Sequence, residues 1–211
     1  MSRPLLISDC DEVLLFMLMP FTEWLHEAHD VHFDIDNLFH GETGDYRNAM
    51  RDPSGDPIDA TRIWPLLKGF FATEMHRQDP IPGAVEAINR LRDHADIVIL
   101  TNLTDDSRDA RAAQLRNIGI DAPVYTNQGG KGATMQGIID QYRPSVAVFV
   151  DDLPPQHKSV AETVPGIIQL HMVGEPRVAR QMSKAETAHA RIDDWHHAER
   201  WIMDRFAGVP L

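Results

Sequence analysis

Short apolar runs, each ending next to a polar residue, constrain the fold more than any other feature of this sequence. They are rich in β-branched side chains and only four or five residues long in most cases. Continuous runs of this kind are typical of strands that helices cover on both faces. We therefore expect five buried strands, at residues 4–8, 97–100, 124–126, 146–150 and 167–170.

Helical patterns separate most of these runs. Apolar residues recur at helical spacing after Pro82-Gly83, and further helices are expected up to Gly119, before Pro144 and after Asp193-Asp194. Alternation of strands and helices predicts an α/β fold with a mostly parallel sheet, a Rossmann-like three-layer sandwich. The expected helices are residues 84–94, a helix capped by Ser107 or Asp109 that runs to about Asn117, residues 132–142 and residues 195–206.

One long interval breaks the alternation. Residues 16–79 separate the first two clear strands, and helical patterns occur near residues 20–29 and 58–76. A loop of this length would be unusual inside a compact domain. We therefore expect a small helical cap at residues 16–79, inserted after the first strand of a core domain made of residues 1–15 and 80–211.

Charge and composition exclude several function classes. Lys plus Arg number 20 and Asp plus Glu number 32, which gives a net charge of −12. This balance argues against nucleic acid polymers and anionic membrane surfaces as partners, since both attract basic proteins. The chain contains neither a secretory signal pattern nor an apolar stretch of membrane-spanning length, so a cytoplasmic location is expected. The single cysteine, Cys10, excludes an intramolecular disulfide and a multi-cysteine zinc site.

Acidic and hydroxyl side chains follow three of the predicted strands. Asp9, Thr101 and the pair Asp151-Asp152 stand where these strands end, and Asp11 follows two residues after Asp9. The carboxyl ends of parallel strands form the usual ligand site of such sheets. Several carboxylates meeting there repel one another unless a cation binds, and an all-oxygen ligand set suits Mg²⁺ best.

The same residues are suited to phosphoryl transfer. A carboxylate can act as a nucleophile and form an aspartyl-phosphate. Thr101 and Lys131, which begins a predicted helix, offer a hydroxyl donor and a positive charge for phosphoryl oxygens. Asp11 is the natural general acid for a leaving alkoxide and the later base for water.

This order of motifs resembles the haloacid dehalogenase-like hydrolase superfamily over roughly residues 5–170. The motifs are LLISDCDEVL at 5–14, IPGA at 81–84, IVILTN at 97–102, Lys131 before a helix, and VFVDD at 148–152. Each motif alone is weakly specific, but the whole set occurs in the family's order. The insertion stands where family members carry a helical cap.

The resemblance implies a role for each matching residue. Asp9 would attack phosphorus and bind Mg²⁺, and Asp11 would be the acid and base with its backbone carbonyl on the metal. Thr101 and Lys131 would hold the phosphoryl group, while Asp151 and Asp152 would complete the metal site. The second aspartate, Asp11, is typical of phosphatases and absent from dehalogenases, whereas Glu12 stands where glycine is common.

The leading hypothesis is a Mg²⁺-dependent phosphatase for a small phosphorylated metabolite: a sugar phosphate, a nucleotide or a phosphorylated organic acid. The alternative is a phosphate-binding or phospho-receiver-like regulatory protein without turnover. In receivers Thr and Lys follow all the acids, whereas here Asp151-Asp152 follow Lys131. Asn102 either contacts substrate or orders its loop.

A metal site is also conceivable at three histidines of the insertion. His26, His29 and His32 recur every three residues. A helix stripe that faces solvent or the cap is the favoured interpretation of this spacing.

Overall fold

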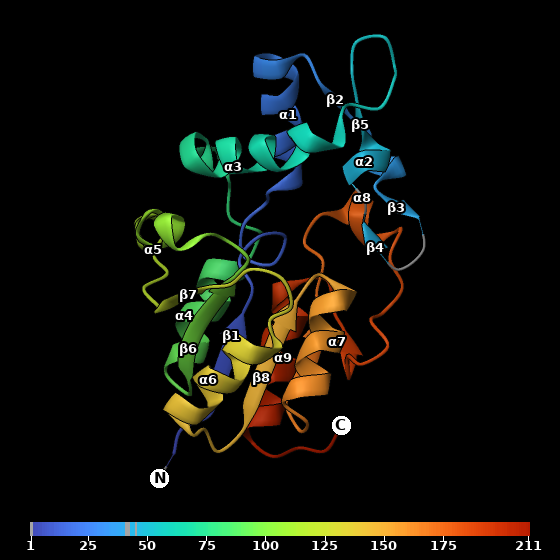
Figure 1. The fold of residues 1–211 in the computed structure, drawn as a ribbon. Helices are drawn as coiled ribbons and strands as arrows, with labels where there is room; N and C mark the ends of the chain where they lie inside the picture. The colour runs from blue at the N-terminus through green and yellow to red at the C-terminus, as the bar shows by residue number, and fades with distance from the viewer. Residues whose placement is uncertain (1, 41–42, 45) are drawn as a thin grey trace.

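The computed structural model describes residues 2–40, 43–44 and 46–211. Its centre is a six-stranded sheet in the order β10-β9-β8-β1-β6-β7, in which all neighbouring strands run parallel (Figure 1). The strands are β1 (Leu5–Ser8), β6 (Asp96–Thr101), β7 (Val124–Thr126), β8 (Ala147–Asp151), β9 (Ile168–His171) and β10 (Ala190–Arg191). The predicted α/β fold is confirmed. The sequence analysis did not include β10, a two-residue edge strand.

Helices cover both faces of the sheet because successive strand residues point to opposite sides. On one face, Leu6 and Ile99 pack with buried residues of α4 (Ala84–Arg92), α5 (Arg108–Asn117) and α9 (Trp195–Phe206). On the other face, Ile7 and Leu100 pack with α6 (Gly132–Tyr142) and α7 (Pro154–Thr163). These layers form the expected three-layer sandwich, although α7 was not among the predicted helices.

The segment between β1 and α4 contains more than helices. Its long helices are α1 (Leu18–His29) and α3 (Ile63–Thr73), and short α2 is Tyr46–Ala49. Two small antiparallel pairs accompany them, β2 (His32–Phe33) with β5 (Met50–Arg51) and β3 (Phe39–His40) with β4 (Thr43–Gly44). Short 3₁₀ turns occur at Ile35–Asn37, Ala60–Arg62, Met75–Arg77 and, before α5, Asp105–Ser107.

This segment has an apolar core of its own. Phe21 of α1 and Phe70 of α3 are fully buried in it, with ring centroids 5.3 Å apart. Val178 of the short helix α8 (Pro176–Ala179), which follows β9, packs into the same cluster. The segment is therefore joined to the sheet layer by contacts as well as by its two connections. Figure 1 shows α1 and α3 beyond the carboxyl ends of the central strands.

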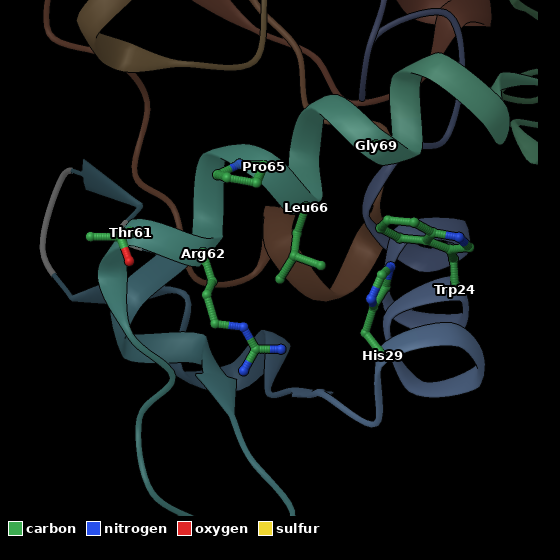
Figure 2. Close-up of a pocket in the computed structure, with 7 residues that line it drawn as sticks. All are labelled: Trp24, His29, Thr61, Arg62, Pro65, Leu66 and Gly69. Atoms are coloured by element: carbon green, nitrogen blue, oxygen red, sulfur yellow. The ribbon is translucent and has the colours of Figure 1, made fainter.

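A surface cleft of about 320 Å³ opens between α1 and α3. Figure 2 shows its lining, which consists of Trp24, His29, Thr61, Arg62, Pro65, Leu66 and Gly69. None of the acids at the strand ends lines it. Among the described residues, no helix has both the length and the apolar character needed to cross a membrane.

Candidate active site

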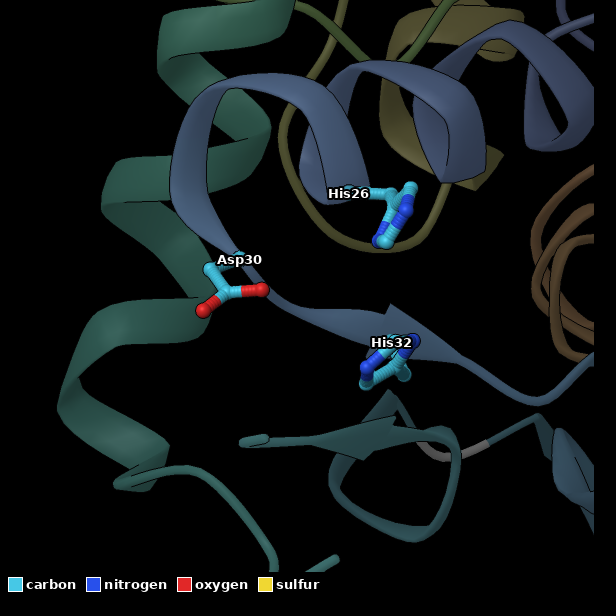
Figure 3. Close-up of side chains that lie close together, drawn as sticks. All are labelled: His26, Asp30 and His32. Carbon is cyan, nitrogen blue, oxygen red and sulfur yellow. The ribbon is translucent and has the colours of Figure 1, made fainter. Parts of the chain in front are cut away.

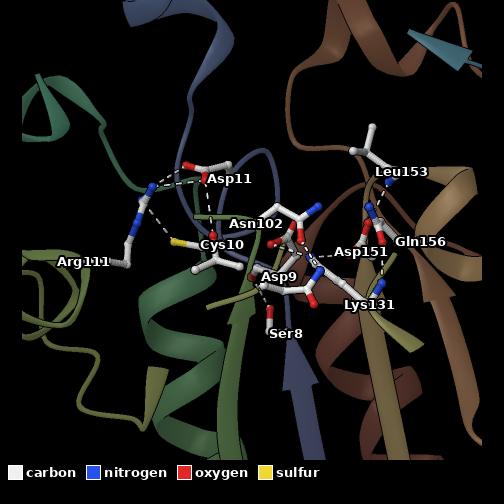
Figure 4. Close-up of polar contacts among 12 residues, drawn as sticks. Ser8, Asp9, Cys10, Asp11, Asn102, Arg111, Lys131, Asp151, Leu153 and Gln156 are labelled. Carbon is white, nitrogen blue, oxygen red and sulfur yellow. Dashed lines mark hydrogen bonds and ion pairs between the residues drawn. The ribbon is translucent and has the colours of Figure 1, made fainter. Parts of the chain in front are cut away.

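Lys131 brings the acids of two neighbouring strands together. Its Nζ lies 2.8 Å from Oδ1 of Asp9, just after β1, and 2.6 Å from Oδ2 of Asp151, at the end of β8 (Figure 4). All three side chains are buried. Burial alone would lower the pKa of Lys131, but the charges of Asp151 and Asp9 raise it above its ordinary value. The lysine therefore stays charged between two carboxylates.

A third buried carboxylate, that of Asp152, completes the cluster. One carboxylate oxygen of each of Asp9, Asp151 and Asp152 lies within 4.8 Å of the others. Burial, together with the charges of Asp151 and Asp11, raises the pKa of Asp9 to about 7, although Lys131 lowers it. Burial and the charge of Asp151 also raise the pKa of Asp152 well above its usual range. Three buried carboxylates, two of them paired with one lysine, fit a divalent cation that prefers oxygen ligands, such as Mg²⁺.

Two buried histidines hold the backbone that carries Asp151 and Asp152. His157 Nε2 lies 3.0 Å from the Asp151 carbonyl oxygen, and His171 Nε2 lies 2.8 Å from that of Asp152. The amide of Ala185 donates to His171 Nδ1, so the ring proton is on Nε2 and points at the Asp152 carbonyl. Burial lowers the pKa of His171 to about 4, which keeps this ring neutral. The sequence analysis missed both histidines.

Asp11 faces different partners from Asp9, although only one residue separates them. Arg111 of α5 donates from Nη2 to both carboxylate oxygens of Asp11, at 2.9 and 3.1 Å. Gln78 Nε2 donates to Asp11 Oδ1 at 2.7 Å, and Thr101 Oγ1 lies 3.5 Å from Oδ2. The side chain of Asp11 therefore lies outside the group of acids around Lys131. The binding of Mg²⁺ by the backbone carbonyl of Asp11 stays a prediction.

Arg111 is the most important residue that sequence reasoning missed. It is fully buried, and its Nη1 donates to Gln78 Oε1 at 3.1 Å and to the Cys10 sulfur at 3.3 Å. One signal was available: Leu115, four residues later, lies on the same side of the helix and is buried. Burial raises the pKa of the Cys10 thiol, which disfavours the thiolate that a nucleophilic cysteine needs.

The loop before Lys131 is fixed by side-chain amides. Asn102 Nδ2 donates to the Gly129 carbonyl at 3.0 Å, and its Oδ1 accepts from Asn127 Nδ2 at 2.8 Å. Gln156 of α7 accepts from the Lys131 amide at 2.9 Å. Gly129 has a φ of +85°, a conformation that favours glycine. Asn102 was expected either to contact substrate or to order its loop. Both of these side-chain contacts serve to order the loop.

Comparison with known proteins concerns the fold of the chain. Residues 73–150 match the family model described as haloacid dehalogenase-like hydrolase. The chain has the haloacid dehalogenase-like fold. Solved haloacid dehalogenase-like hydrolases from Streptococcus pneumoniae and Xanthomonas campestris superpose with TM-scores of 0.63 and 0.59, both at 12% identity. The alignment with the Streptococcus pneumoniae protein covers 95% of this chain and 98% of that protein. The alignment with the Xanthomonas campestris protein covers 99% of this chain and 98% of that protein.

A third similar structure holds ligands. D,D-heptose 1,7-bisphosphate phosphatase from B. bronchiseptica, complexed with magnesium and phosphate, has a TM-score of 0.58 and 12% identity. The alignment covers 96% of this chain and 99% of that protein. No curated protein matches the sequence. The expected resemblance to the haloacid dehalogenase-like superfamily is confirmed.

Glu12 stands where the resemblance led us to expect glycine, and its backbone has a conformation that favours glycine. Its φ is +58°, so glycine would be the unstrained residue here. Its buried side chain accepts, through Oε1, from the amides of Met17 at 2.8 Å and Leu18 at 2.7 Å. Burial raises the pKa of Glu12 to about 7, although these two amides lower it. The glutamate thus ties the loop after β1 to the start of α1.

Proposed function

We propose that the protein is a Mg²⁺-dependent phosphatase that hydrolyses a small phosphomonoester through an aspartyl-phosphate on Asp9. The observation that carries the proposal is the buried group of Asp9, Asp151 and Asp152 around Lys131, at the ends of two adjacent parallel strands. A similar fold in a phosphatase that was solved with magnesium and phosphate supports it.

The metal would be held by the side chains of Asp9, Asp151 and Asp152, and by the backbone carbonyl of Asp11. Bound Mg²⁺ would neutralise charge on the phosphoryl oxygens and stabilise the charge that develops there during transfer. Lys131 contributes a fixed positive charge, and Thr101 at the end of β6 would be a further contact for the phosphoryl group, while Asn102 orders the loop that leads to Lys131. The positive charges of Mg²⁺ and Lys131 would offset the negative charges of the acids, so that the site could bind an anionic phosphoryl group.

The two steps use Asp9 and Asp11. A carboxylate oxygen of Asp9 attacks phosphorus, the bond from phosphorus to the ester oxygen breaks, and Asp11 gives its proton to the departing alkoxide. Asp11 then takes a proton from water while the water oxygen attacks phosphorus. The bond from phosphorus to Asp9 breaks, which releases inorganic phosphate and restores the Asp9 carboxylate. Arg111 and Gln78 donate hydrogen bonds to the Asp11 carboxylate and so hold it in one orientation.

We propose further that residues 16–79 act as a cap for small substrates. The segment lies beyond the strand ends in Figure 1, and Glu12 and Gln78 connect it directly to the loop that carries Asp9 and Asp11. Closure over the site would exclude bulk water before transfer. A covered site favours a small phosphorylated metabolite over a nucleic acid polymer.

Hydrolysis of a generic aryl phosphate tests the proposal. The full-length protein should release phosphate with Mg²⁺ and lose this activity with a chelator. Asp9→Asn removes the nucleophile and should reduce turnover at least about 1,000-fold. The matched control is Asp109→Asn, an exposed acid of α5, which should retain full activity. Full activity of Asp9→Asn would contradict the mechanism. If the activity depends on Asp9, a panel of phosphorylated metabolites identifies the substrate class.

A further inference from the structure

A second group of metal-ligand side chains lies on the segment between β1 and α4. It consists of His26 on α1, Asp30 at the end of that helix and His32 on β2. One ligand atom of each residue lies within 4.8 Å of the others. Figure 3 shows His26 facing His32, with Asp30 at the turn between them. All three side chains are exposed.

The backbone of the turn brings these residues together. His26 and Asp30 are four residues apart, so they lie on the same side of α1. Asp30 has a φ of +52°, which ends the helix and reverses the chain. The amides of Asp30 and Val31 both donate to the Leu25 carbonyl, and Val31 is buried. The turn is thereby fixed, and β2 returns beneath the last turn of the helix.

The ligand atoms are available to an ion. In the described part of the chain, none of the three side chains has a hydrogen-bond or ion-pair partner. The rings of His26 and His32 are 5.1 Å apart between centroids. Arg51 pairs with His32 across the β2–β5 ladder, but its Nη1 donates to the carbonyls of Arg47 and Met50. That guanidinium is therefore held by backbone oxygens on its own strand and on α2.

His29 does not belong to this group, although it shares the three-residue spacing of His26 and His32. Its ring packs against Trp24, with centroids 4.4 Å apart, and lines the cleft of Figure 2. The spacing alone therefore described the wrong set of residues. The turn at Asp30 brings His26 and His32 together and places the Asp30 carboxylate beside them.

We propose that His26, Asp30 and His32 bind a late first-row transition metal ion, with Zn²⁺ as the representative ion. Two imidazoles and one carboxylate are a common ligand set for Zn²⁺, and a water or another ligand fills the remaining position. Zinc bonds of about 2.0–2.2 Å require shorter separations between ligand atoms than 4.8 Å. The three side chains are exposed, so binding of the ion would draw their ligand atoms together by rotation about side-chain bonds.

The proposed ion differs from the one at the strand ends because the ligand atoms differ. The buried acids offer only oxygen, which suits Mg²⁺, whereas imidazole nitrogen favours zinc, copper, nickel or iron. Metal bound at His26, Asp30 and His32 would connect the end of α1 to β2. Because the ion binds only the folded arrangement, it should stabilise this segment in proportion to the logarithm of its concentration.

Zn²⁺ titration of the full-length protein, in excess Mg²⁺ to occupy the buried acids, tests the proposal. His26→Gln and His32→Gln each remove one ligand and should weaken Zn²⁺ binding at least about tenfold, since loss of an outer-shell partner alone costs about 10–100-fold. His29→Gln is the matched control on the same exposed helix end and should bind like the unsubstituted protein. Equal Zn²⁺ affinity in all variants would overturn the proposal.

A measurement on the unsubstituted protein does not depend on the folding of any variant. NMR of the imidazole nitrogens should show Zn²⁺-dependent shifts for His26 and His32, and none for His29. The melting temperature should rise with Zn²⁺ in the unsubstituted protein and in His29→Gln, and rise less in His26→Gln. Unchanged resonances of His26 and His32 at saturating Zn²⁺ would overturn the site, irrespective of any phosphatase activity.

Discussion

Asp9 and Asp11 lie at the end of the same strand, yet the regions around them have opposite charge balance. Around Asp9, three buried carboxylates lie close together, and Lys131 pairs with two of them, Asp9 and Asp151. Around Asp11, one carboxylate is matched by the fully buried guanidinium of Arg111 and by the Gln78 amide. The first region has an excess of negative charge that a divalent cation offsets. The second is neutral within the chain, and it holds a carboxylate in a fixed orientation.

The largest expected effect comes from removing the positive charge of Lys131 beside Asp9. Lys131→Met leaves Asp9 and Asp151 buried without their shared partner, and breaking such a pair costs about 3–5 kcal/mol. Chemical denaturation without metal should show this loss, and Mg²⁺ should recover part of it. Lys158→Met, at an exposed position of α7, is the control and should change stability little. Equal stability of both variants would remove the contrast between the two regions.

Removal of Arg111 should have a smaller effect on stability, because the side chain of Asp11 is 17% exposed and water can replace part of the lost pairing. Arg111→Met should cost about 1–3 kcal/mol and lower kcat more than it raises KM for an aryl phosphate. Mg²⁺ should not restore this loss.

Arg111→Lys is the informative companion variant. It keeps the charge but loses the planar guanidinium, whose Nη2 holds Asp11 while Nη1 holds Gln78, so it should recover stability better than kcat. An unchanged kcat in Arg111→Met would show that the orientation of Asp11 by Arg111 is not needed for turnover.

The smallest expected effect concerns Glu12, between the two regions. Its pKa is about 7 in the fold against 4.5 for the unperturbed group, so the folded state binds the proton more tightly. Stability from this group is therefore greatest below about pH 4.5 and falls as the pH rises to about 7. Glu12→Gln should remove part of this fall, at most about 3 kcal/mol, and keep both hydrogen bonds through its amide oxygen.

Melting curves of the metal-free protein between these pH values measure the effect. Glu23→Gln, at an exposed position of α1, is the control and should retain the pH dependence of the unsubstituted protein. The same dependence in Glu12→Gln would show that the buried carboxylate contributes nothing to it.

The strands and the acids at their ends could be predicted because both signals are local. An apolar run that stops at an acid predicts β1 and β8 within one residue, and parallel pairing then places Asp9 beside Asp151. The Arg111–Asp11 pair joins residues 100 positions apart. Because α5 is polar, an arginine there is expected on the solvated face. Only the packing of Leu115 against the sheet turns that face inward.

Positions that depend on backbone conformation were equally difficult to predict. Nothing local to Glu12 indicates a φ of +58° or a side chain that caps the start of α1. The grouping of His26 with His32 depends on the reversal at Asp30 rather than on helical spacing. His157 and His171 act on carbonyl oxygens, which the sequence pattern does not reveal.

Direct detection of a phosphoryl group on Asp9 tests the central claim most directly. The protein should be mixed with an aryl phosphate and Mg²⁺, quenched in acid within a single turnover and mapped by peptide mass spectrometry. We expect the added phosphoryl mass on the peptide containing Asp9, with none in Asp9→Asn, and decay of this species as phosphate is released. Turnover of the aryl phosphate with no phosphoryl group on Asp9 at any quench time, or with the group on another residue, would contradict the account.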